Sequence, residues 1–134
     1  MAFQGYFVKV GNYKIPLKYI ESDTYNGYRS VQDLDSYRDG NGKLHRDALP
    51  HVPCKAEFET TPLMAEAEFD ELMGNIENNF IDELERKANV TVYIPEKRTY
   101  ITQEMYIPDI KPAVDCILNG ELFYKPTRFA FIGY

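Results

Sequence analysis

Residues 61–80 read TPLMAEAEFDELMGNIENNF, and this stretch has the clearest helical period in the chain. Its apolar residues recur every three or four positions, which places them on one face of a helix. They are Ala65, Phe69, Leu72, Met73, Ile76 and Phe80. Thr61 is predicted as the N-cap and Pro62 as the first helical residue. The sequence allows two positions for the C-terminal end of this helix. It ends near Asn79 or, because the apolar spacing fits one more turn, near Arg86.

Strand-like segments lie on both sides of this helix. Alternating apolar and polar residues or short apolar runs favour strands, and they occur at residues 6–10, 13–20, 54–60, 90–94, 99–107, 113–118 and 121–132. Asn119-Gly120 favours a two-residue type I′ turn between two of them. Pro16 makes residues 13–20 an edge strand or an interrupted one, and Pro126 interrupts the last segment.

The order of these elements predicts the fold class. Hairpins dominate and no alternation of strand, helix and parallel strand appears, so the sheet is expected to be antiparallel. A lone amphipathic helix must bury its apolar face, and a sheet is the available partner. The sequence therefore predicts a single domain over residues 1–134, mainly β with one helix (α+β). The expected architecture is an antiparallel two-sheet sandwich or partly rolled barrel flanked by the single amphipathic helix.

Residues 30–49 are polar and contain the strongest turn signal, the sequence Asp39-Gly40-Asn41-Gly42. They predict a long polar hairpin with an exposed tip, although an irregular surface loop fits the composition equally well. A polar ribbon is marginally stable alone, so we expect it to gain order by lying on a neighbour.

Composition excludes several classes of function. The 134 residues are 44% hydrophobic, enough for a core, and the formal net charge is −6. Nucleic-acid binding needs a basic face, so an acidic chain is not expected to bind DNA, although it suits a surface that DNA slides past. No apolar run of about 18 residues predicts a membrane segment, and the N-terminal residues lack a secretory pattern. Cys54 and Cys116 are expected to be reduced and buried.

No motif predicts catalysis, a cofactor or a metal. His45, His51 and Cys54 lack the paired spacing of zinc ligands. The acidic residues around Gly40 fail the spacing of a calcium loop, because Arg46 stands where a glutamate is needed. No nucleophile has a recognisable base beside it in the sequence. The sequence therefore predicts a protein that is not an enzyme.

The features in order resemble small β-rich structural proteins of long-tailed bacteriophages and prophages, the group of tail-tube, terminator and tail-tip subunits. The similarity is carried by the tip at residues 39–42, the Thr61-Pro62 helix start with its acidic helix, and two strands. These strands read VTVYIP at residues 90–95 and FAFIGY at residues 129–134.

This resemblance implies a non-enzymatic structural component of a bacteriophage tail that assembles with itself into a ring around the DNA channel. The ring position (tube, terminator or adaptor, or tip) and the ring size remain open, with a hexamer as one candidate. The implied partners are further copies and other tail proteins, while DNA passes through without specific binding. In such a ring the contacts between subunits are expected from the hairpin residues Arg38, Asp39, Asn41, Lys43 and Arg46. The implied location is the virion tail, after synthesis in the host bacterial cytoplasm.

Another class of function also fits the sequence. Tyr25, Tyr28 and Tyr37 lie near one another in the chain and predict an aromatic platform if they gather on one surface. The alternative hypothesis is therefore a monomeric β-sandwich binding module for carbohydrate or peptide. A small enzyme on a β scaffold is a third hypothesis, for which the sequence offers no paired residues.

Overall fold

The structure is a computed structural model that describes residues 3–134. Its main sheet has the strand order β2-β1-β9-β10-β13-β6-β3, with β8 paired to β9 beside this path, and every pair in it is antiparallel. The strands are β1 (Val8–Val10), β2 (Tyr13–Lys14), β3 (Asn26–Arg29), β6 (Cys54–Glu59), β8 (Phe80–Asp82), β9 (Lys87–Ile94), β10 (Thr99–Tyr106) and β13 (Arg128–Gly133).

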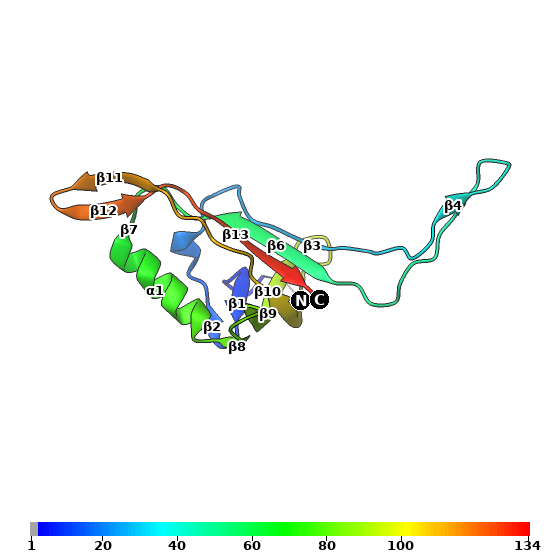
Figure 1. Ribbon diagram of the computed structural model, residues 1–134, viewed down its shortest axis with the longest axis horizontal. Coiled ribbons are helices and arrows are strands. Elements are labelled where there is room, and N and C mark those ends of the chain that lie inside the picture. Colours follow the sequence, from blue (N-terminus) through cyan, green and yellow to red (C-terminus); the bar gives the residue numbers. More distant parts are fainter. Residues whose placement is uncertain (1–2) are drawn as a thin grey trace.

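Two smaller sheets complete the β structure. One has the order β11-β12-β7, formed by β11 (Val114–Leu118), β12 (Glu121–Tyr124) and β7 (Met64–Ala65). The other pairs β4 (Tyr37–Arg38) with β5 (Leu44–His45). The described chain is thus mainly β, antiparallel and sandwich-like, with the single helix α1 (Glu66–Glu77) on one flank (Figure 1). This confirms the predicted fold class, in its sandwich form rather than as a closed barrel.

The main sheet curls until β3 approaches β9. The Tyr25 hydroxyl, just before β3, donates a hydrogen bond to the Tyr93 carbonyl at 2.6 Å. A Cβ atom at Gly27 would lie only 2.4 Å from the same oxygen, so this approach requires glycine. Residues 26–29 form strand β3. No strand was predicted there, because these residues show little alternation of apolar and polar side chains.

The predicted start of the helix is wrong. Thr61 and Pro62 do not begin it, because Met64 and Ala65 pair with Tyr124 and Phe123 of β12 as strand β7. Leu63, just before them, adopts a positive φ of 54°, a left-handed conformation that a right-handed helix cannot contain. The helix then starts at Glu66, where the Glu68 carboxylate accepts the backbone N–H of Ala65.

The helix ends as the shorter of the two predictions states. Asn78 is its C-cap, and the extension towards Arg86 is wrong because residues 80–82 form β8 against β9. Phe69, Leu72 and Ile76 of the predicted apolar face are buried. The helical period therefore identified the packing face correctly, even though it misplaced the first turn.

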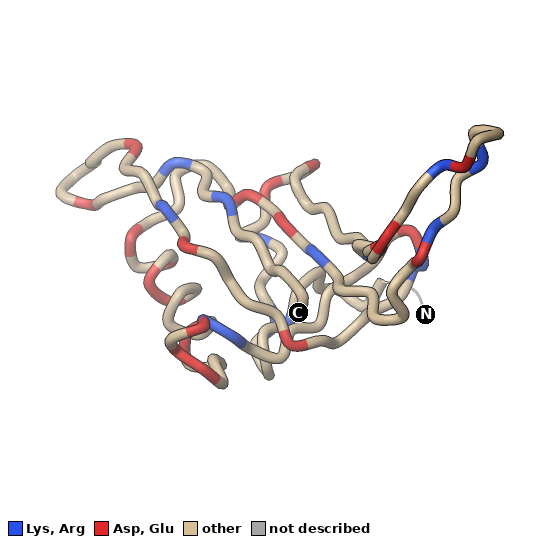
Figure 2. The backbone as a smooth tube through the Cα atoms, turned by 45° about the vertical axis from the view of Figure 1, so that its right-hand side comes forward, with Lys and Arg blue, Asp and Glu red and all other residues tan. Residues whose placement is uncertain are grey.

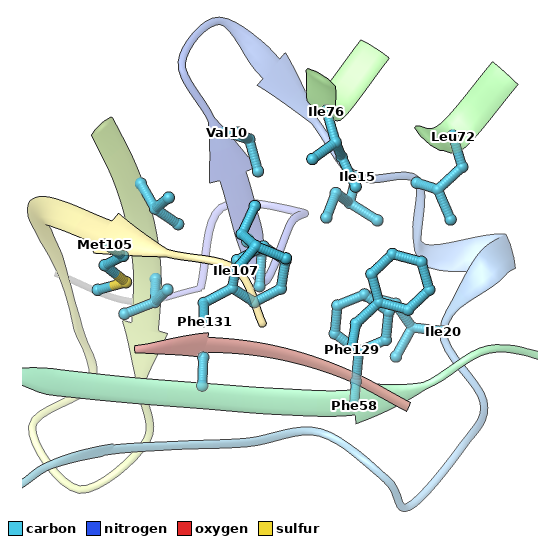
Figure 3. Close-up of a cluster of buried hydrophobic side chains, with 14 of the residues drawn as sticks. Val10, Ile15, Ile20, Phe58, Leu72, Ile76, Met105, Ile107, Phe129 and Phe131 are labelled. Atoms are coloured by element: carbon cyan, nitrogen blue, oxygen red, sulfur yellow. The ribbon is translucent and has the colours of Figure 1, made fainter. Parts of the chain in front are cut away.

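The core lies between the curled sheet and the helix (Figure 3). Phe58 and Phe129, paired across β6 and β13, stack with ring centroids 5.3 Å apart. Leu72 and Ile76 of α1 close this cluster from the helix side. β13 lies between β10 and β6, which confirms that the strand with two apolar faces is internal.

The first hairpin confirms the role predicted for Pro16. β2 is the edge strand at one end of the main sheet and contains only Tyr13 and Lys14. The rest of the predicted strand 13–20 is instead a single 3-10 turn, Leu17–Tyr19, that follows Pro16. The proline lacks a backbone N–H, so pairing at this edge cannot continue through it.

Candidate interaction surfaces

Two hairpins project from the body of the protein, and they mark the two ends of its long axis (Figure 1). We call residues 30–53 with β4 and β5 the arm, and residues 114–124 with β11 and β12 the aliphatic hairpin. The arm leaves the body beside β3 and β6, whereas the aliphatic hairpin extends beyond α1. The same molecule therefore presents two different protruding surfaces in opposite directions.

The arm is a hydrogen-bonded hairpin along its length. Ser30 donates its backbone N–H to the Pro53 carbonyl at 2.7 Å at the base, and Leu34 donates to Asp47 at 2.8 Å further out. Tyr37 pairs with His45 near the tip, where their rings stack 4.9 Å apart. This confirms the predicted polar hairpin over the alternative of an irregular loop.

Asp39 organises the tip. One of its carboxylate oxygens, Oδ1, accepts the backbone N–H groups of Asn41 at 2.9 Å and Lys43 at 3.0 Å. Its other oxygen accepts a hydrogen bond from His45 Nε2 at 2.9 Å. The hydrogen bond from His45, followed by those from the backbone, holds the pKa of Asp39 below its ordinary value.

A second carboxylate orders the middle of the arm. Arg46 binds Asp33 with two hydrogen bonds, from Nη2 at 2.9 Å and from Nε at 3.1 Å. Ser36 donates a third bond to Asp33 at 2.8 Å. The hydrogen bond from Arg46, followed by the one from Ser36, lowers the pKa of Asp33. The hydrogen bond to Asp33 in turn raises the pKa of Arg46.

The structure places the five predicted interface residues on one exposed arm, in two kinds of environment. Asp39 and Arg46 hold the arm together, and Arg38 donates from Nη1 to the Gly42 carbonyl at 2.9 Å. Asn41 and Lys43 give only their backbone N–H groups to this network, and both residues are exposed. Their side chains are therefore the ones directed to the surroundings of the tip.

The aliphatic hairpin is attached to the body through its second strand. Phe123 and Tyr124 pair with Ala65 and Met64 of β7, and the Tyr124 ring packs on Phe69 of α1 at 4.9 Å between centroids. The turn confirms the type I′ prediction, because Asn119 and Gly120 both have positive φ, 53° and 78°.

Apolar side chains of the aliphatic hairpin face solvent. Val114, Ile117 and Leu118 are 51%, 66% and 53% exposed. Ile117 pairs with Leu122 on one face of the ribbon, and Cys116 pairs with Phe123 on the other. Both faces are thus apolar, although a ribbon surrounded by water normally keeps one polar face.

Sequence reasoning found this hairpin but missed its exposure. The alternation of a short apolar strand is the same whether the strand lies in a core or projects from it. The signal that could have revealed it is the combination of two short apolar strands with Pro112 and Pro126 at their outer ends. Prolines at both ends detach such a hairpin from the main sheet.

The two cysteines have different environments. Both are free, and Cys54 is fully buried on β6, where burial raises the pKa of its thiol. Cys116 is only partly buried on β11, so the expectation that both cysteines are buried is wrong for this one.

The tyrosines of the alternative hypothesis do not form a common platform. Tyr25 stacks on Phe7 at 4.3 Å, and burial raises its pKa. Tyr37 lies on the arm against His45, while Tyr28 is exposed on β3. The aromatic binding surface predicted from their spacing is therefore not assembled.

Other candidate groups are also separated. His45 contacts Asp39 on the arm, His51 contacts the Tyr134 carbonyl, and Cys54 is buried in the main sheet. Within residues 3–134, no three His, Cys, Asp or Glu side chains gather as metal ligands. In the same range, no helix has the length and apolar character needed to cross a membrane.

The described chain thus combines an antiparallel β body with one flanking helix and two projecting hairpins. The chain belongs to the family of unknown function DUF6711, whose sequence profile matches residues 1–134. No curated protein matches it.

Two solved structures share the fold. One is a chain from the tail of an empty gene transfer agent particle with C6 symmetry, with a TM-score of 0.52 and 15% identity over 99% of this chain and 95% of that chain. The other is a chain from the virion of a native gene transfer agent particle, with a TM-score of 0.52 and 14% identity over 100% and 94%. At these identities the likeness concerns the fold.

Proposed function

We propose that this protein is a non-enzymatic structural component of a bacteriophage-type tail. The observation that carries the proposal is the shared fold with chains of gene transfer agent particles, over nearly the full length of both partners. One of those particles is a tail with C6 symmetry. We infer that the present chain also assembles with itself into a ring, for which six copies is the favoured number, around a DNA channel.

The placement of the two hairpins supports self-assembly. A cyclic ring of identical subunits uses a heterologous contact, in which one surface binds a different surface of the next copy. The arm and the aliphatic hairpin are two different surfaces at opposite ends of the molecule (Figure 1). A chain of this shape presents one surface to each of its two neighbours.

The arm supports the same proposal through its composition. Leu34, Tyr37 and Leu44 are exposed on a segment that has no buried residue between positions 30 and 51. Ordering such an arm loses conformational entropy, and the arm alone buries almost no apolar surface to offset that loss. Arg38, Asp39, Asn41, Lys43 and Arg46 are accordingly proposed as the subunit-contact residues on it.

Charge is consistent with a channel. The formal net charge of −6 produces an overall repulsion of DNA phosphates, so DNA would pass without specific binding. The proposal places the protein in the virion tail, beside other tail proteins, after synthesis in the host bacterial cytoplasm. Tube, terminator or adaptor, and tip are the positions it includes.

The test is the mass of the purified chain by light scattering across a concentration series, followed by electron microscopy of any large species. Rings of one size, or tubes built from rings, are expected to form as the concentration rises. A chain that stays monomeric both alone and with tail proteins expressed beside it would overturn the ring.

A further inference from the structure

The arm tip and the aliphatic hairpin have opposite charge. Residues 37–46 at the tip contain three basic residues, Arg38, Lys43 and Arg46, and one acidic residue, Asp39, which gives a net charge of +2. Three further acidic residues nearer the body bring the whole arm to a net charge of −1, so the positive charge is local to the tip. Residues 114–124 contain the acidic residues Asp115 and Glu121 and no basic residue, a net charge of −2. Figure 2 shows both colours along the arm, and only acidic positions beyond the base of the aliphatic hairpin.

The charges of the arm tip are available for a partner. In residues 3–134, the ion pairs of the arm join Asp39 to His45 and Asp33 to Arg46, which leaves Arg38 and Lys43 without a carboxylate. Arg38 uses Nη1 for the Gly42 carbonyl, so its remaining N–H groups and the whole ammonium of Lys43 are the donors left for a partner. On the aliphatic hairpin, neither Asp115 nor Glu121 forms an ion pair within the same range. The arm tip therefore carries unpaired basic groups and the aliphatic hairpin unpaired acidic groups, while the unpaired Asp35 and Asp47 lie nearer the base of the arm.

The aliphatic hairpin also offers an open edge. β11 pairs with β12 on one side, and no described strand pairs with its other side. An open edge strand with exposed apolar side chains is a template for another strand. On the arm, β4 and β5 pair only with each other in the described chain. β11 of the aliphatic hairpin and the strands of the arm thus each have an edge on which a further strand could pair.

We propose that the arm of one copy docks on the aliphatic hairpin of the next copy. Arg38 and Lys43 face Asp115 and Glu121, and the exposed leucines and Tyr37 of the arm cover Ile117, Leu118 and Val114. A second copy is the occupant favoured by the charges and by the opposite placement of the two surfaces on one molecule. This inference rests on the proposed self-assembly and names the pair of surfaces that performs it.

Disulfide trapping between copies tests the contact directly. Cys116 lies on β11, Cys54 is fully buried, and Asn41→Cys adds one exposed thiol at the arm tip without changing its charge. Diamide, which is reduced as two thiols form a disulfide, should link position 41 of one copy to Cys116 of the next. The expected product on a non-reducing gel is a ladder of trimers and larger species, since each copy has two linkable positions.

Matched controls separate this result from random collision. Wild type has only Cys116 accessible, and Asn41→Cys with Cys116→Ser has only the arm thiol, so each gives dimers at most. An equimolar mixture of these two single-thiol forms, one of them carrying a tag that separates it on the gel, should give mixed 41–116 dimers in large excess over both like dimers. Mixed dimers at no more than the statistical half of all dimers would overturn the docking.

Charge reversal provides a second, independent test. The arm variant Arg38→Glu with Lys43→Glu places acidic residues against an acidic hairpin. The hairpin variant Asp115→Lys with Glu121→Lys places basic residues against the basic arm tip. Each variant alone should need about tenfold or more concentration for half-assembly than wild type. An equimolar mixture should recover assembly, because every contact between unlike copies again joins opposite charges.

The outcomes distinguish the inference from the proposed function. If wild type assembles and both reversed variants assemble equally well, the hairpin contact is wrong while self-assembly stands. If neither assembly nor a cross-linked ladder appears for any form of the chain, self-assembly itself is wrong. Recovery on mixing is the result that supports both.

Discussion

The arm and the aliphatic hairpin are both two-stranded projections, but they are stabilised in different ways. Beyond its own backbone pairing, the arm depends on hydrogen bonds accepted by the Asp33 and Asp39 carboxylates in water. The aliphatic hairpin depends on backbone pairing to β7 and on the contact of Tyr124 with α1. Changes in the arm should therefore stay local, whereas changes at the base of the aliphatic hairpin should affect the whole fold.

The largest effect is expected from Phe69→Ala. Phe69 packs on Tyr124 at 4.9 Å and on Phe129 at 6.1 Å, so it joins the aliphatic hairpin to the central strand. Its removal should lower the free energy of unfolding by about 3 kcal/mol, as for other buried phenylalanines. Urea unfolding followed by circular dichroism measures this value. Tyr37→Ala on the arm is the matched aromatic control and should change it by less than about 0.5 kcal/mol; equal losses would refute the contrast.

A smaller effect is expected from a pair of glycine substitutions. Gly120 and Gly42 have positive φ values of 78° and 81°, and a Cβ atom at either would meet no other group. Gly120→Ala should cost about 1 kcal/mol of global stability, because the strained turn lies in a hairpin paired to the body. Gly42→Ala should instead loosen the arm and leave the global value unchanged. Urea unfolding gives the first quantity and hydrogen exchange of the arm amides gives the second. A global loss from Gly42→Ala would show that the arm is coupled to the core.

Deleting residues 38–43 should change global stability still less, within about 0.5 kcal/mol, because the segment lies outside the core. The deletion should nevertheless abolish assembly if the arm makes the subunit contact. Unfolding experiments and light scattering on the same protein separate the two results. Gly40→Ala is the matched control, since a Cβ atom there meets nothing within 4 Å. An unfolded deletion variant, or one that assembles like wild type, would contradict this account of the arm.

The smallest effect concerns pH and is confined to the arm. The pKa of Asp33 and that of Asp39 are lower in the folded arm than the ordinary value of 3.8. Ionised carboxylates therefore stabilise the arm fully above that value, and this stabilisation is lost as pH falls through the lowered folded-state pKa values. Amide resonances of the arm should lose dispersion below pH 3.8 before those of the body. Asp33→Asn with Asp39→Asn should remove this pH step, and a step that persists would assign it to other groups.

The sequence predicted the fold best where short-range patterns determine it. Alternation identified β6, and the strand-like runs identified the β9–β10 pair, while Asn119-Gly120 predicted its turn type. The start of α1 was wrong because Met64 and Ala65 pair with β12, about 60 residues further along the chain. No local pattern contains that pairing, and Thr61-Pro62 is a good helix start in isolation.

The candidate surfaces were predicted less evenly. Polar composition and the Asp39–Gly42 turn revealed the arm, but not that Asp39 and Arg46 would be engaged inside it. The exposed Ile117 and Leu118 were missed, because an apolar strand gives the same pattern inside and outside a core. Exposure depends on what lies opposite a residue in space, and that is set by the tertiary arrangement.

The short outer strand β2 has a consequence for the protein before assembly. A long exposed edge strand on the main sheet would let newly made chains pair through backbone hydrogen bonds and aggregate. β2 contains only two residues, and Pro16 ends its pairing soon after. A concentrated pool of newly synthesised subunits should therefore stay dispersed in the cell, ready for incorporation, with growth restricted to the hairpins.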